Sequence, residues 1–89
     1  MPDFNYEFTV QHGQVTRLPF GSFGGMWAVP AKDGQPAKAK VAIRLPGGEE
    51  EARILSVDDT LALPNGTWTV VEISGAASSR WTLWLRRVD

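Results

Sequence analysis

The clearest structural signal in the chain is the segment 37–45, which reads AKAKVAIRL. Its apolar residues alternate with Lys38, Lys40 and Arg44, so successive side chains point to opposite faces of an extended strand. The proline and two glycines that follow predict a turn, and the segment 50–57 returns as an antiparallel partner. This pattern predicts a β-hairpin with one buried face and one charged face.

The same period of two recurs along the chain. Strands are expected, in order, at residues 4–11, 15–20, 26–29, 37–45, 50–57, 60–63, 67–74 and 80–88. Most of the nine glycines and six prolines fall between these segments, and no window shows helical periodicity. The glycine-rich run 21–25 predicts a bulge or a corner at which a strand changes sheets. The predicted fold class is all-β: a single antiparallel β-sandwich or flattened barrel of seven to eight short strands, in one domain over residues 1–89.

Alternation also predicts which side chains form the core. The expected core consists of Phe4, Tyr6, Phe8, Val41, Ile43, Ile54, Leu61, Trp68, Val70, Trp81, Leu83 and Leu85. The segment 67–73 has apolar residues on both faces, and a bulge there would shift the register. The sequence therefore does not predict which face of this segment points inward. The four tryptophans supply much of the apolar area that an 89-residue chain needs to fold without staples.

Composition excludes several classes of function. Nine Lys and Arg against ten Asp and Glu leave a net charge of -1, which does not favour a general nucleic-acid binder. The absence of cysteine excludes disulfides, a thiol nucleophile and Cys-ligated zinc. No apolar run is long enough to span a membrane, and the acidic start differs from a signal peptide. We therefore expect a cytoplasmic protein that does not contact the membrane.

No residue pattern predicts catalysis, a metal site or a cofactor. The single histidine, His12, lies in an expected surface turn, and no serine occupies a G-x-S-x-G elbow. Asp58 and Asp59 are adjacent, so their side chains diverge in an extended chain instead of forming a catalytic pair. The glycine-rich run 21–25 is not followed by the helix that a phosphate cradle requires. We expect a protein that is not an enzyme and that uses no cofactor.

The last expected strand contains the first candidate binding surface. The alternation that buries Trp81 places Trp84 beside Arg86 on the opposite face. An exposed tryptophan next to an arginine is typical of binding hot spots. Trp27 is a candidate by the same reasoning. The alternative for Trp84 is that another segment covers it in a second, minor core.

The second candidate surface is the charged face of the segment 37–45. Lys38, Lys40 and Arg44 share this face, and Arg53 is expected to join them from the returning strand. A basic sheet face is one ingredient of binding to nucleic acid or to an acidic partner. The alternative is a solvated face whose charges provide solubility and protect a sheet edge.

The C-terminal half carries a recognisable pattern. Residues 55–61 read LSVDDTL, residues 64–73 read PNGTWTVVEI, and residues 80–85 read RWTLWL. This combination resembles small actinobacterial all-β proteins that belong to a domain family of unknown function. The resemblance implies an all-β fold and supplies no functional residues.

Two classes of function remain as hypotheses. The first is a non-enzymatic interaction module that binds a protein partner, or a second copy of itself, through a sheet edge and the patch of Trp84 and Arg86. The alternative is recognition of an oligosaccharide or a single-stranded nucleic acid, on the Trp84 surface or on the face of Lys38, Lys40 and Arg44. Of the two polymers, the net charge disfavours nucleic acid.

Overall fold

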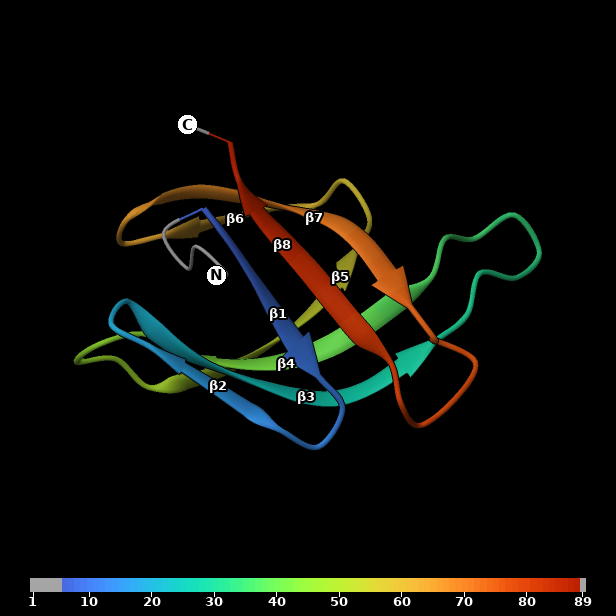
Figure 1. Cartoon of the computed structure of the whole chain (residues 1–89), viewed down its shortest axis with the longest axis horizontal. Coiled ribbons are helices and arrows are strands. Elements are labelled where there is room, and N and C mark those ends of the chain that lie inside the picture. The colour runs from blue at the N-terminus through green and yellow to red at the C-terminus, as the bar shows by residue number, and fades with distance from the viewer. Residues whose placement is uncertain (1–5, 89) are drawn as a thin grey trace.

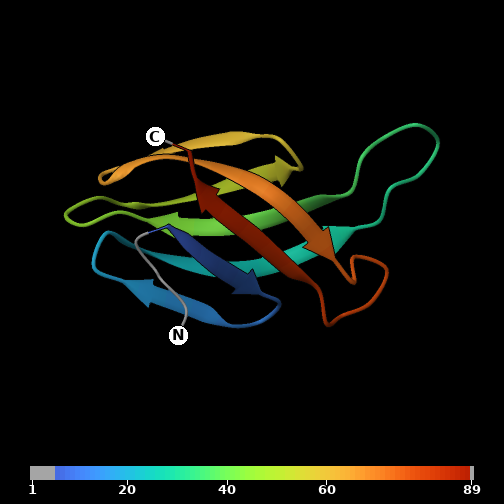
Figure 2. The same cartoon turned by 45° about the horizontal axis from the view of Figure 1, so that its top comes forward.

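The computed structural model describes residues 6–88, and its regular structure consists of β-strands. In chain order these are β1 (Glu7–Gln11), β2 (Val15–Leu18), β3 (Gly21–Val29), β4 (Lys38–Arg44), β5 (Glu50–Ser56), β6 (Thr60–Leu63), β7 (Gly66–Ser74) and β8 (Thr82–Arg87). They form two four-stranded antiparallel sheets, in the orders β1-β8-β7-β6 and β2-β3-β4-β5. The two sheets lie face to face as two layers (Figure 1, Figure 2), so the predicted all-β sandwich is confirmed. No helix in the described residues is long and apolar enough to cross a membrane.

The core lies between the two sheets and is built from their inward-facing residues. It contains Phe8, Val10, Phe20, Phe23, Ala39, Val41, Ile43, Leu55, Leu61, Leu63, Trp68, Val70, Trp81, Leu83 and Leu85. An aromatic cluster joins the layers, since the ring of Phe8 lies 4.7 Å from that of Phe23 and 4.9 Å from that of Trp68. The indole nitrogen of Trp68 donates a hydrogen bond to the side-chain oxygen of Asn65 (3.0 Å), so this buried polar group is satisfied.

Most members of the predicted core are confirmed, and the prediction is wrong for two residues. Phe4 lies outside the described residues. Tyr6 is 58% exposed because β1 begins only at Glu7, and its ring lies 5.9 Å from the guanidinium of Arg87. Ile54 is 55% exposed. The side chains that the alternation missed lie mainly in β1, β3 and β6 and in the β2–β3 turn.

Ile54 points outward because of the register between β4 and β5. Lys40 lies opposite Ile54, and Ala39 lies opposite Leu55. Directly paired residues of an antiparallel ladder point to the same face, so Ile54 shares the outer face with Lys40, and Leu55 enters the core. The same register pairs Arg53 with Val41 and therefore turns Arg53 inward. Arg53 does not join the basic face, contrary to the prediction.

Two bulges change the faces that simple alternation predicts. The glycine-rich run 21–25 is not a corner between sheets but the first half of the continuous strand β3. The pairing of β3 with β4 shifts between Gly25 and Trp27, which leaves Met26 as the extra residue. A second shift lies between Val70 and Glu72 of β7, inside the segment whose face the alternation left open.

The chain passes from one sheet to the other in the turn between β1 and β2, and this turn packs against β3 (Figure 1). The N–H of Gly13 donates to the carbonyl of Gly25 (3.0 Å), and the N–H of Gly25 donates to the carbonyl of Gln14 (3.1 Å). The indole N–H of Trp81 donates to Nδ1 of His12 (3.2 Å). The single histidine thus lies in the expected exposed turn and links this turn to the core.

Candidate functional site

The six predicted site residues lie on two opposite outer faces of the sandwich. Trp84 and Arg86 belong to β8 in one sheet, whereas Trp27 belongs to β3 in the other. Lys38, Lys40 and Arg44 are on β4, in the same sheet as Trp27. The structure therefore separates the predicted aromatic and arginine patch from the predicted basic face, and it adds Trp27 to the basic face.

Trp84 points outward, as the alternation predicts, but it is only half-buried and not free. It lies between Thr9 of β1 and Glu72 of β7 on the ladder. Its indole nitrogen is buried and has no hydrogen-bond partner among the described residues. Arg86 is exposed, and its guanidinium lies 3.4 Å from the carboxylate of Glu7. The charge of Arg86 is therefore compensated, and the indole of Trp84 offers no accessible donor.

Trp27 is the more exposed of the two candidate tryptophans, with 38% of its surface open. The bulge at Met26 resets the alternation, so that Trp27 lies opposite Lys40 on β4. Lys40 in turn lies opposite Ile54 on β5. A row of three outward side chains results, with a lysine between a tryptophan and an isoleucine. The next row along the same face pairs Val29 with Lys38.

We call the outer side of the sheet β2-β3-β4-β5 the basic face. Its central residues are Trp27, Val29, Lys38, Lys40, Arg44 and Ile54, and the register adds Arg17 and Val15 of β2 and Glu50 of β5. The ion pairs found among residues 6–88 are Arg53–Glu51 and Arg86–Glu7, so no cation of the basic face takes part in one. The face combines exposed apolar side chains with cations that form no ion pair, and the carboxylate of Glu50 lies opposite Arg44 at its margin.

Large exposed apolar side chains are concentrated on this sheet. Val15, Trp27, Val29 and Ile54 lie on its outer face, and Met26 forms the bulge beside Trp27. In the described part of the other sheet, no strand residue is a large exposed hydrophobic side chain. An apolar patch ringed by polar residues is a feature of interaction sites. Ile54, Val29 and Arg17 were missed because only the strand register brings them together with Lys40 and Trp27.

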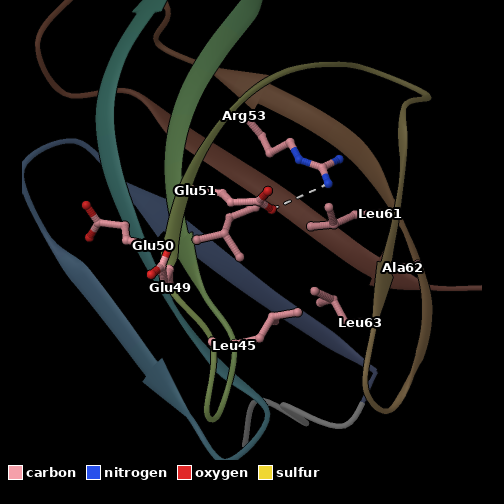
Figure 3. Close-up of a pocket in the computed structure, with 10 residues that line it drawn as sticks. Leu45, Glu49, Glu50, Glu51, Arg53, Leu61, Ala62 and Leu63 are labelled. Carbon is pink, nitrogen blue, oxygen red and sulfur yellow. Dashed lines mark ion pairs between the residues drawn. The ribbon is translucent and has the colours of Figure 1, made fainter.

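Arg53 faces a cavity at the seam between the edge strands β5 and β6 (Figure 3). The cavity has a volume of ≈ 380 Å³ and is lined by apolar side chains that include Leu45, Leu61 and Leu63. The guanidinium of Arg53 extends across the seam toward Leu61 and lies 3.7 Å from the carboxylate of Glu51. We call this site the seam cavity.

The described residues contain no group of three or more His, Cys, Asp or Glu side chains that could hold a metal ion. The chemistry available on the basic face is contact area and positive charge, and that of the seam cavity is an apolar pocket with charged margins.

Comparison with known proteins extends the resemblance that the C-terminal half suggested. No curated protein and no solved structure matches the chain. A family model matches residues 5–89, so the similarity is not confined to the C-terminal half. This match covers nearly the whole chain, and the protein therefore belongs to a family of unknown function (DUF6406).

Proposed function

We propose that this protein is a non-enzymatic interaction module that binds an acidic protein partner through the basic face. The observation that carries the proposal is the row of Trp27, Lys40 and Ile54, in which an exposed aromatic anchor lies among cations that have no ion-pair partner. A rigid aromatic side chain supplies large contact area at low cost in conformational entropy. The bacterial, actinobacterial origin and the cytoplasmic location expected from the sequence belong to the same proposal.

The partner's chemistry follows from the layout of the face. Trp27, Val29 and Ile54 provide an apolar centre, and Lys38 and Arg44 provide positive charge along β4. A complementary surface presents an apolar side chain flanked by Asp or Glu. Such charges steer the encounter of the two proteins and select against wrong partners.

A second copy of the chain fits this face less well. Two basic faces in a symmetric dimer would bring Lys38, Lys40 and Arg44 against their own counterparts, and like charges facing each other across an interface cost several kcal/mol. A different, acidic protein avoids this repulsion. We therefore expect the purified protein not to self-associate through this face.

Single-stranded nucleic acid is the competing occupant. A cationic sheet with an aromatic platform is the usual arrangement for such ligands. The basic face offers one tryptophan, and its other exposed apolar side chains, Val15, Val29 and Ile54, are aliphatic and cannot stack on successive bases. Aliphatic side chains around a single aromatic suit a protein surface better.

The experiment compares two matched double variants. One carries Trp27→Ala with Lys40→Gln on the basic face, and the other carries Trp84→Phe with Arg86→Gln on the opposite face. Each removes one cation and alters one aromatic side chain. A protein captured from a cell lysate by the native chain is identified and purified, and its affinity for all three forms is measured by calorimetry.

We expect the basic-face variant to weaken binding about a hundredfold, and the opposite-face variant by less than about threefold. Equal losses, or a loss in the opposite-face variant alone, contradict the proposal. A parallel titration with an oligothymidylate and a neutral oligosaccharide tests the other occupants. Oligothymidylate binding that falls steeply with salt and requires Lys40 would assign the face to nucleic acid. Salt-insensitive sugar binding that requires Trp27 would assign it to an oligosaccharide.

A further inference from the structure

The seam cavity is a second site, separate from the basic face and on the inner side of β5 (Figure 3). Leu45, Leu61 and Leu63 line it, and its volume of ≈ 380 Å³ is near the lower end of the range of about 300–1,000 Å³ that ligand pockets occupy. A cavity of this size takes one or two side chains of a partner. The neighbouring edge strand determines how they can reach it.

β6 is the edge strand beside this cavity, and it differs from the other edge strands of the described sheets. β1 carries Glu7, β2 carries Arg17, and β5 carries Glu51 and Arg53, whereas Thr60–Leu63 contains no charged residue. Charged side chains on an edge strand oppose pairing with another chain. β6 also has no proline and no bulge within its pairing with β7. Only its short length limits strand addition.

We propose that β6 accepts an extended segment of a partner protein, which adds a strand to the sheet β1-β8-β7-β6 and inserts an apolar side chain into the seam cavity. Successive side chains of a strand point to opposite faces, so every second residue of the added segment points inward, as Leu61 and Leu63 do. Main-chain hydrogen bonds to β6 provide affinity, and the pocket provides specificity, as in other cases of strand addition.

The margin of the cavity selects a basic residue in the same segment. The carboxylates of Glu49 and Glu51 line the cavity with the single guanidinium of Arg53, whereas Glu50 lies opposite Arg44 on the outer face. Arg53 already lies 3.7 Å from Glu51, and Glu49 has no ion-pair partner among residues 6–88. A lysine or arginine two positions from the apolar residue shares its inward side and meets this margin. The occupant is a segment in which basic and large apolar residues alternate with small polar ones.

This segment is cationic, whereas the partner of the basic face is acidic, so the two sites are independent. The probe is the peptide acetyl-TKTLTKT-amide, in which the lysines and the leucine share one face of a strand. The control peptide, acetyl-TKTATKT-amide, replaces only the leucine. Binding to the isotopically labelled full chain is followed by NMR, through chemical shifts and through hydrogen exchange of the backbone amides of Thr60–Leu63.

We expect the leucine peptide to shift and protect the amides of β6, and the alanine peptide to bind about tenfold more weakly. Glu51→Lys reverses one charge at the margin and should weaken the leucine peptide about tenfold. Glu72→Lys makes the same charge change on the outer face of the other sheet and should weaken it by less than about twofold. Glu51 and Glu72 do not belong to the core, so both variants are expected to fold.

Three results would overturn the proposal. One is the absence of any change at β6 with about 1 mM peptide. Another is equal binding of the two peptides, and the third is protection at β1, β2 or β5 in place of β6. Concentration-dependent protection of β6 without peptide would identify a second copy as the occupant. The variant with Trp27→Ala and Lys40→Gln should bind the leucine peptide as the native chain does. The proposal for β6 and the proposal for the basic face can therefore be refuted independently.

Discussion

Gly25→Ala tests how closely the β1–β2 turn packs against β3. Gly25 is needed for space and not for a left-handed backbone, because it is not among the glycines with positive φ. A Cβ atom added at Gly25 would overlap the carbonyl oxygen of Gln11. It would also lie 2.7 Å from the carbonyl carbon of Gln11 and 2.9 Å from Cη2 of Trp81. Cβ atoms do not approach a backbone this closely, so the turn and β3 must separate.

The size of the effect follows from what blocks the methyl group. Added methyl groups in a packed core usually cost about 1–3 kcal/mol, because side chains can move aside. Here the main obstacle is the Gln11 backbone, and separating the strands also weakens the hydrogen bonds that join Gly25 to Gly13 and Gln14. We expect a loss of about 3 kcal/mol, the upper end of that range. For a domain of this size, such a loss lowers the melting temperature by about 12–24 °C.

The assay is thermal and urea denaturation followed by circular dichroism, with Gly24→Ala as the control. A Cβ atom at Gly24 would lie 3.6 Å from Cγ2 of Val15 and 3.9 Å from the Cβ of Ala42, which are ordinary contacts on the outer face. The control should change the free energy of unfolding by less than about 1 kcal/mol. If the two variants melt together, the proposed close approach of the Gln11 backbone is refuted.

Three further predictions concern the core and the aromatic side chains, and each is measured by urea denaturation. Leu55→Ala should cost about 2–4 kcal/mol and Ile54→Ala less than about 1 kcal/mol; the reverse order would mean that the register of β5 is different. Asn65→Ala removes the acceptor of the Trp68 indole and should cost about 1–3 kcal/mol, whereas an unchanged stability would show that this hydrogen bond contributes nothing. Trp84→Phe removes a buried N–H without a partner, so it should change stability by less than about 1 kcal/mol, and a loss above about 3 kcal/mol would place the indole in the core.

Alternation predicts faces correctly where a strand is regular. On β4, Ala39, Val41 and Ile43 are buried, whereas Lys38, Lys40 and Arg44 point outward. On β8, Leu83 and Leu85 are buried and Trp84 points outward. Inside a regular strand the direction of each side chain is a local property of the backbone, so the sequence of that strand is sufficient to predict it.

The predictions fail where the answer depends on contacts between segments. Ile54 is outward because of the register of its hairpin, and a shift of one residue reverses every side chain of a strand. Met26 and Trp27 are both exposed because a bulge inserts one residue opposite β4. Tyr6 is exposed because its strand starts one residue later. Neither a register nor a bulge leaves a clear local pattern in a single sequence.

The candidate site shows the same difference between what one strand predicts and what the pairing of strands decides. That Lys38, Lys40 and Arg44 share a face was predictable from the spacing along one strand. Their position beside Trp27 and Ile54 depends on the pairing of three strands, which local spacing does not specify. The seam cavity depends on how far β5 and β6 lie apart at the margin of the two sheets. No property of either strand alone encodes that separation.

The net charge of the chain does not describe how its charges are distributed over the surface. The formal value of -1 averages over regions of opposite sign. Arg17, Lys38, Lys40 and Arg44 lie on one outer face, with Glu50 at its margin, whereas Glu49 and Glu51 line the seam cavity. The Debye length is about 8 Å at physiological salt, which is shorter than the width of a four-stranded sheet. A partner at the basic face therefore meets mainly the local positive field, and a segment at β6 meets mainly the negative one. A small sandwich with almost no net charge can in this way present two regions of opposite charge, as the two proposed sites require.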